Sequence, residues 1–125
     1  MSGGPGLLAV MADAERGLGR PEKALEIGRS PEARDLDEDS RIELAIVMAG
    51  ARHDMGQHES ALATLQQLNP TMKGDGFEHI RLAYAYGDAL AQVGRTDEAR
   101  QWFEHVSKVD TDELTDAAER LKELK

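Results

Sequence analysis

The chain has 125 residues, no cysteine, and a net charge of −9 from 15 Lys+Arg and 24 Asp+Glu. The length is typical of one domain with its own core, and the missing cysteine excludes a disulfide framework, a thiolate zinc site and a cysteine nucleophile. The acidic balance argues against binding to nucleic acid or to an anionic membrane. No apolar run reaches the roughly 20 residues that a membrane-spanning helix needs, and no secretory leader is recognisable, so we expect a cytoplasmic protein.

Residue usage predicts an all-α fold without strands. Aromatic residues make up only 4% of the chain. Ala, Leu, Glu, Arg and Gln dominate, and these residues lose little conformational entropy in a helix.

Helix-starting residues divide the chain into seven expected helices. Ser40 and Glu43 form a capping box, Thr96 suits an N-cap, and Thr111 or Asp112 caps the last helix. In chain order, the helices are expected at residues 7–18, 21–29, 41–55, 58–68, 77–93, 97–108 and from the last cap to 124.

Shorter segments surround these helices. Residues 1–6 are expected to form a flexible leader, and residues 71–76, with two glycines, the loosest loop. Pro21 suits the first position of a helix, and Ser30-Pro31-Glu32 is expected to open one helical turn.

A glycine followed five residues later by an alanine occurs three times. The glycines are 37 and 38 residues apart (56−19 and 94−56), and a leucine stands twelve residues before each of them. We expect each glycine to end a helix with positive φ, and each alanine to be buried where the next helix crosses back. Because one hairpin cannot bury its own apolar face, such units stack into a solenoid. The three pairs are Gly19 and Ala24, Gly56 and Ala61, and Gly94 and Ala99.

This pattern resembles the tetratricopeptide repeat family over residues 7–110. The third unit matches most fully, since Gly87 follows Tyr86 and Phe103 follows Ala99 at the family's spacing. The family's tryptophan is absent, and the period exceeds the usual ~34 residues. The repeat signature comprises Gly19, Ala24, Gly56, Ala61, Gly87, Gly94, Ala99 and Phe103.

The resemblance implies an α-α superhelix of three helical hairpins and a capping helix. The repeats are expected at about 7–36, 41–70 and 77–110, and the capping helix at 111–125. The runs 13–24 and 115–121 further resemble the C-terminal half of a larger bacterial tetratricopeptide protein. We therefore expect the chain to be a fragment of a longer repeat protein.

The resemblance also implies a binding function without catalysis. Family members bind proteins or peptides on the exposed inner face of each first helix. The lysine, arginine and asparagine clamp of the chaperone-binding members is not present here. By register, the expected partner-contact residues are Arg16, Glu43, His53, Asp54, Arg81, Tyr84, Asp88 and Gln92, with Asp13 and Ile46 on the same face.

Two aromatic residues have two interpretations each. Tyr84 either packs by its ring edge between hairpins or contacts a bound peptide. Trp102, the only tryptophan, either covers the last hairpin or forms part of an exposed patch that anchors a partner.

No catalytic, metal or cofactor site is expected. His53 and His58 are five residues apart with Gly56 between them, whereas a helical zinc pair needs i and i+4 and a third ligand. They are therefore interpreted as surface histidines. The chain contains no G-x-S-x-G, P-loop or G-x-G-x-x-G sequence.

The N-terminal hairpin supports an alternative function. Leu7, Leu8, Val10 and Met11 present more apolar surface than one neighbouring helix can bury. This face is expected to meet another copy of the chain or preceding repeats, and a structural homo-oligomerisation module is the alternative to a scaffold. An enzyme or metal protein on a helical frame is the third alternative.

Overall fold

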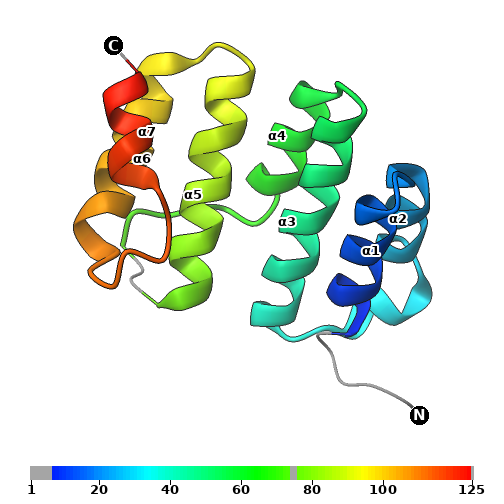
Figure 1. Cartoon of the computed structure of the whole chain (residues 1–125). Coiled ribbons are helices and arrows are strands. Elements are labelled where there is room, and N and C mark those ends of the chain that lie inside the picture. Colours follow the sequence, from blue (N-terminus) through cyan, green and yellow to red (C-terminus); the bar gives the residue numbers. More distant parts are fainter. Residues whose placement is uncertain (1–6, 74–75, 125) are drawn as a thin grey trace. The chain divides into compact units, whose positions relative to one another are not determined.

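The computed structural model describes residues 7–73 and 76–124, and within these ranges the chain is helical with no strand (Figure 1). The all-α prediction is confirmed. The expected leader at 1–6 lies outside the described residues, as do two residues of the loop at 71–76. No helix in the described ranges is both long enough and apolar enough to cross a membrane. The elements are α1 (Leu7–Gly17), α2 (Pro21–Gly28), the 3-10 turn η1 (Pro31–Asp35), α3 (Glu38–Asp54), α4 (His58–Gln66), α5 (Phe77–Gln92), α6 (Thr96–Val109) and α7 (Ala117–Glu123).

Three glycine turns of the same backbone geometry join the helix pairs. The φ angles are +77° at Gly19, +75° at Gly56 and +86° at Gly94, as predicted. In each turn the residue after the glycine donates its N–H to the carbonyl five residues earlier, at 2.8–2.9 Å, which satisfies an otherwise unpaired helix-end carbonyl. The alanines that follow, Ala24, Ala61 and Ala99, are each 0% exposed, which confirms their predicted burial.

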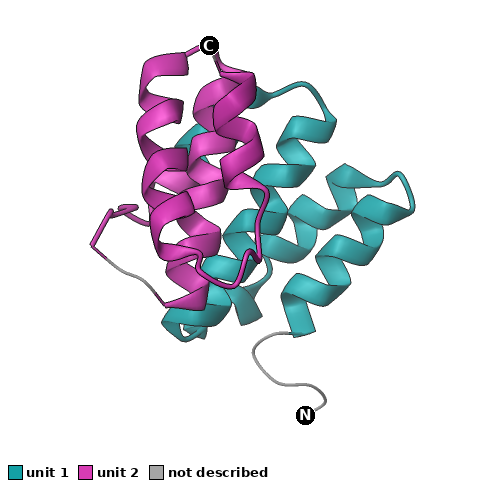
Figure 2. Cartoon of the chain, turned by 60° about the vertical axis from the view of Figure 1, so that its left-hand side comes forward, with its two compact units in different colours: residues 1–64 teal, residues 65–125 magenta. Residues whose placement is uncertain are grey.

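The chain divides into two compact units, residues 1–64 and 65–125 (Figure 2). In the first unit, α1, α2 and α3 pack against one another around a core rich in small side chains. In the second unit, α5 packs on α6, and α6 on α7. Gly87 lets α5 and α6 approach closely, since a Cβ there would lie 3.2 Å from Phe103 Cε1 and 3.3 Å from Trp102 Cβ.

Two predicted helix starts are wrong by one to three residues. The capping box at Ser40 and Glu43 does not start α3. Asp37 is the N-cap, and its carboxylate accepts a 3.2 Å hydrogen bond from Ser40 N. Thr96 is not the N-cap of α6 but its first residue, and Arg95 is the N-cap. The backbone hydrogen bond from Arg95 N to Leu90 O, which closes the glycine turn, holds Arg95 at this position.

The last helix begins at Ala117 and not after Thr111 or Asp112. Asp110, which is 7% exposed, accepts hydrogen bonds from Leu114 N (2.8 Å), Thr115 N (2.8 Å) and Thr115 Oγ1 (2.7 Å). These bonds hold residues 110–115 in an irregular loop that competes with helix formation. Of the apolar residues in this loop and helix, Ala117 is buried, Leu121 and Leu124 are partly buried, and Leu114 and Ala118 are exposed.

Asp110→Asn is expected to destabilise the chain at neutral pH by about 1–3 kcal/mol, because partly buried N–H groups lose a charged acceptor. Burial raises the pKa of Asp110, but the hydrogen bonds from Thr115 and from the Leu114 backbone outweigh it, so the pKa lies below its ordinary value of 3.8. A lowered pKa stabilises the fold above the unfolded value and stops doing so as pH falls through the folded value. The difference between wild type and variant should therefore shrink below about pH 4.

Urea denaturation at pH 7 and at several points down to pH 2.5 measures this difference. Asp112→Asn is the matched control, since Asp112 is exposed in the same loop. A constant difference across that range would contradict the role assigned to the Asp110 carboxylate.

Candidate functional site

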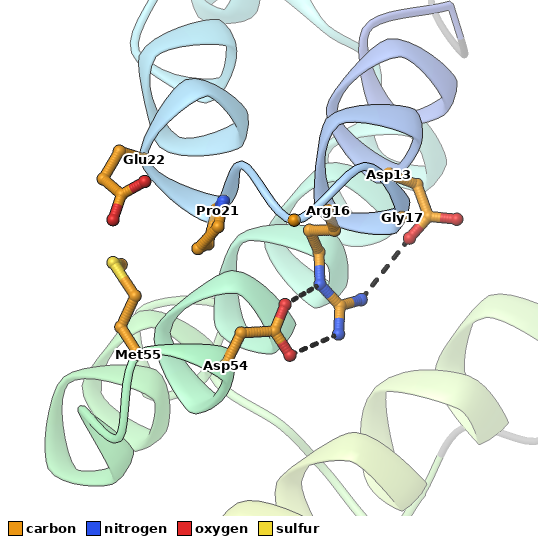
Figure 3. Close-up of a pocket in the computed structure, with 8 residues that line it drawn as sticks. Asp13, Arg16, Gly17, Pro21, Glu22, Asp54 and Met55 are labelled. Carbon is orange, nitrogen blue, oxygen red and sulfur yellow. Dashed lines mark hydrogen bonds and ion pairs between the residues drawn. The ribbon is translucent and has the colours of Figure 1, made fainter.

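Three of the residues predicted to face a partner meet in the first unit. Asp13 and Arg16 lie on α1, and Asp54 is the last residue of α3 (Figure 3). Arg16 Nε and Nη2 donate to the two oxygens of Asp54 at 2.8 and 3.1 Å, a bidentate pair, and Arg16 Nη1 lies 3.4 Å from Asp13 Oδ1. The hydrogen bond to Asp54 is the main reason that the pKa of Arg16 is raised, and the same bond lowers the pKa of Asp54.

These charged groups line an open hollow of about 640 Å³. Its remaining wall comes from the first glycine turn and the start of α2, and from the end of α3, where Met55 lies (Figure 3). The side chains of Arg16, Asp54 and Asp13 are 29%, 37% and 63% exposed, so they are accessible to a ligand.

Gly50 on α3 makes room for the Arg16 guanidinium. A Cβ at Gly50 would stand 2.5 Å from both Cζ and Nη1 of Arg16. The guanidinium is therefore seated against the α3 backbone, and any side chain at position 50 would displace it. Gly50 lies outside the predicted site, and the sequence marks it only by its place four residues before Asp54.

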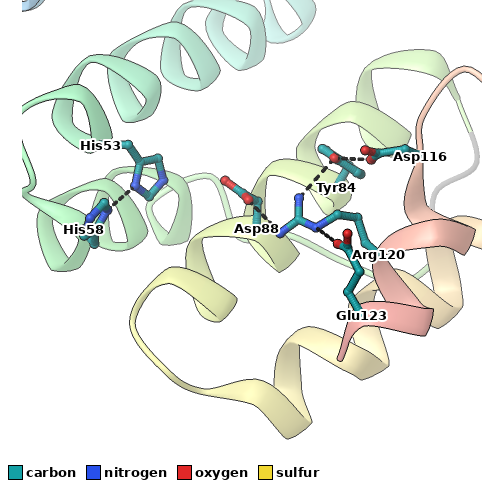
Figure 4. A network of polar contacts seen from close by, with 7 residues as sticks. All are labelled: His53, His58, Tyr84, Asp88, Asp116, Arg120 and Glu123. Atoms are coloured by element: carbon teal, nitrogen blue, oxygen red, sulfur yellow. Dashed lines mark hydrogen bonds and ion pairs between the residues drawn. The ribbon is translucent and has the colours of Figure 1, made fainter. Parts of the chain in front are cut away.

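A second group of predicted residues meets in the second unit. Tyr84 and Asp88 on α5 contact Arg120 on α7 (Figure 4). Arg120 Nη2 donates to Asp88 Oδ1 at 2.9 Å, and Arg120 Nη1 donates to the Tyr84 hydroxyl at 3.2 Å. The Tyr84 hydroxyl in turn donates to Asp116.

Aromatic rings complete this cluster. The guanidinium carbon of Arg120 lies 4.8 Å from the ring centroid of Phe103 and 5.9 Å from that of Tyr84. Tyr84 also meets Phe103 edge to face, with centroids 5.5 Å apart. Tyr84 thus packs by its ring on Phe103 within one hairpin, and its hydroxyl is used within the chain.

The electrostatics follow from this arrangement. Burial, and then the hydrogen bond to Asp116, raises the pKa of Tyr84 to about 12. Burial opposes the charged form of Arg120, but the hydrogen bonds to Asp88 and Tyr84 outweigh it and raise the pKa of this guanidinium. Arg120 was not among the predicted site residues. The sequence indicates its position only indirectly: Arg120 stands three residues after Ala117 and so shares the inward side of α7 with it.

The other predicted residues lie elsewhere on their helices. His53 Nδ1 lies 2.8 Å from His58 Nδ1 across the second glycine turn, with ring centroids 5.0 Å apart (Figure 4). The Arg81 guanidinium lies 5.8 Å from the ring centroid of Phe77. Glu43 is partly buried on α3, as is Ile46, and Gln92 is exposed at the end of α5.

The partly buried Trp102 packs edge to face on Tyr86, with ring centroids 5.0 Å apart and an interplanar angle of 90°. Tyr86 is itself partly buried, and its hydroxyl accepts a 3.3 Å hydrogen bond from Gln66 Nε2. Within residues 7–73 and 76–124, no three of His, Cys, Asp and Glu are placed to hold a metal ion. The two described clusters offer paired charges and aromatic faces, which is the chemistry of recognising charged side chains.

Comparison with protein-family models, with curated proteins and with solved structures returns no match. The tetratricopeptide resemblance therefore rests on the residues of the chain itself.

Proposed function

We propose that the chain is a protein- or peptide-binding scaffold of the tetratricopeptide type, with no catalytic activity. The observation that carries this proposal is the hollow of the first unit. Asp13, Arg16 and Asp54 were placed on the partner-facing side by repeat register alone, and all three line one open hollow. The proposed architecture is an α-α superhelix of three repeats, which the three equivalent glycine turns support.

The hollow suits a charged group of an extended peptide. Arg16 is held by two carboxylates at its open surface, and a carboxylate of a partner would replace Asp54 at the guanidinium with the same bidentate geometry. Because exposed ion pairs contribute little to stability, such an exchange costs the fold little.

Gly50→Ala is expected to weaken peptide binding at least tenfold while leaving the fold as stable as before or more stable. The new methyl group displaces the Arg16 guanidinium, the far end of a flexible side chain, so the steric cost to the core is small. Alanine in the middle of a helix is favoured over glycine by up to about 1 kcal/mol. The measurement is binding of the labelled chain to an immobilised array of random dodecamer peptides, with thermal denaturation alongside.

Gly76→Ala is the matched control, because Gly76 does not line the hollow and the added methyl group would meet only His79 Cδ2, at an ordinary 3.9 Å. It should bind the same peptides as the wild-type chain. If the wild-type chain binds no peptide, or if Gly50→Ala binds the same peptides with the same strength, the hollow is not a peptide site.

A second candidate function is self-association through the N-terminal hairpin, and the exposed face of α1 favours it. Val10 is 65% exposed, Met11 44% and Leu7 38%, while Ala9 and Ala12 on the opposite side of α1 are buried. Covering these side chains would gain about 1.5–3 kcal/mol for each fully buried one.

Val10→Glu is expected to abolish self-association if this face joins two copies, because a charge would be buried without a partner. Light scattering at high protein concentration measures the mass against the 13.7 kDa of one chain. Leu114→Glu is the control, since Leu114 is a comparably exposed apolar residue, at 56%, in the other unit. A wild-type mass of one chain at every concentration would exclude this candidate.

A further inference from the structure

The C-terminal helix α7 is a short segment that is held mainly by polar contacts. Among its seven residues only Ala117 is fully buried. Arg120 reaches from α7 to α5, and Arg100 on α6 donates to the Leu124 carbonyl just after α7 at 3.2 and 3.1 Å. A helix that buries so little apolar surface is the kind of element that detaches while the rest of a unit stays folded.

The receptor for the Arg120 side chain belongs mostly to the other two helices of the unit. Asp88 and Tyr84 come from α5 (Figure 4), and Phe103 comes from α6. The hydroxyl and the carboxylate bind the guanidinium N–H groups, and the aromatic rings lie near its carbon. If α7 detached, these three side chains would remain together.

The geometry fits a guanidinium better than an ammonium. Arg120 uses two separate nitrogens for Asp88 and Tyr84 and also lies against two aromatic rings. A planar fork with several N–H donors meets all of these groups at once, whereas the compact ammonium of lysine does not. The net charge of −9 attracts a basic partner to the chain as a whole.

The face of α5 that the Arg120 side chain reaches is the one predicted to bind a partner. Tyr84 and Asp88 were both assigned to it by register, and both are engaged by Arg120. The chain therefore supplies its own ligand to this surface.

We propose that Tyr84, Asp88 and Phe103 form a binding site for an arginine of a partner protein, and that Arg120 is an internal ligand that occupies this site until the partner displaces it. This proposal rests on the scaffold function proposed above, and it names the partner chemistry and the regulation. While α7 is docked and Arg120 fills the site, the partner cannot bind. The apparent dissociation constant for the partner is therefore the intrinsic constant divided by the fraction of molecules in which the site is open.

The first test removes the Arg120 side chain from the site by substitution, without shortening the chain. In the full chain with Arg120→Ala, N-ethylguanidinium at millimolar concentration is expected to shift the NMR signals of Tyr84 and Asp88 saturably. N-ethylammonium should bind at least roughly tenfold more weakly, and the wild-type chain should not respond to either compound, because Arg120 fills its site. Arg120→Ala combined with Asp88→Asn is the control and should not respond.

The second test supplies the arginine on a peptide. The probe is a fluorescein-labelled synthetic peptide with the sequence of residues 111–124, and a second peptide carries lysine in place of its arginine. The Arg120→Ala chain is expected to bind the arginine peptide at least tenfold more tightly than the wild-type chain does, and more tightly than it binds the lysine peptide. If Arg120→Ala does not fold, Arg120→Lys takes its place and should bind the arginine peptide more tightly than the wild-type chain.

Equal binding of the arginine peptide by wild type and variant would overturn the internal ligand. Equal binding of the arginine and lysine peptides, or no response to N-ethylguanidinium, would overturn the arginine site. Neither result bears on the proposed scaffold function. That function is tested by the binding of array peptides and its loss in Gly50→Ala, which depend on the hollow of the first unit. Loss of that capture, with the arginine peptide still bound, would overturn the hollow and leave the arginine site.

Discussion

Phe103→Ala is expected to lower the free energy of unfolding by about 3–5 kcal/mol, the usual cost of deleting a buried aromatic side chain. Phe103 is 0% exposed and is the largest fully buried side chain of the described residues. Its ring meets Tyr84 edge to face and lies against the Arg120 guanidinium, and Gly87 on α5 packs directly on it. Removing the ring leaves a cavity between α5 and α6 and takes away a contact of α7 at the same time.

Urea denaturation followed by circular dichroism measures this loss. Phe77→Ala is the matched control, because Phe77 has the same side chain on α5 but is 52% exposed. It should cost about 1 kcal/mol or less, since little burial is lost. Similar losses for the two variants would show that Phe103 is not a core residue. Because domains of this size are stable by about 5–15 kcal/mol, Phe103→Ala is also the variant most prone to unfold.

Ala99→Leu is expected to cost about 1–3 kcal/mol, through overpacking and not through a cavity. Ala99 is 0% exposed and lies on the buried face of α6, with Phe103 one turn later and Val106 two turns later. A leucine there adds three carbon atoms to a face that already packs on α5. Leucine and alanine both favour helices, so the loss would come from packing and not from helix propensity.

The midpoint of thermal or urea denaturation measures the cost. Ala63→Leu, at an exposed position of α4, is the control and should change stability by no more than about 0.5 kcal/mol. An unchanged midpoint for Ala99→Leu would mean that α5 and α6 have room at this crossing, and that the small residue there is not required by packing.

Local rules were enough to predict the repeated turns. Gly19, Gly56 and Gly94 adopt positive φ because a glycine after a helical run is the residue that enters this conformation without a steric penalty. Ala24, Ala61 and Ala99 are buried because each stands at the same offset from its turn. Both features depend on neighbours within a few positions along the chain, so the sequence alone determined them, together with the all-α class.

Competition between polar groups decided the features that sequence analysis missed. Asp37 caps α3 although Ser40 and Glu43 match a capping box, because both starts satisfy local rules and only the folded chain selects one. Asp110 holds a loop where helix residues were expected, because burial makes its hydrogen bonds stronger than they would be in water.

Each candidate site likewise has residues that the sequence predicted and contacts that only the folded chain reveals. Repeat register, through the resemblance to the tetratricopeptide family, predicted Arg16 and Asp54 on the face that we propose binds a partner. Register does not reveal that Gly50 seats the Arg16 guanidinium, or that Arg120 reaches Asp88 from a helix 32 positions further along the chain. An arginine side chain is long enough to pair with any of several acidic groups, so the sequence does not reveal its partner. Here the packing of α7 on α6 brings the Arg120 guanidinium to Asp88, Tyr84 and Phe103.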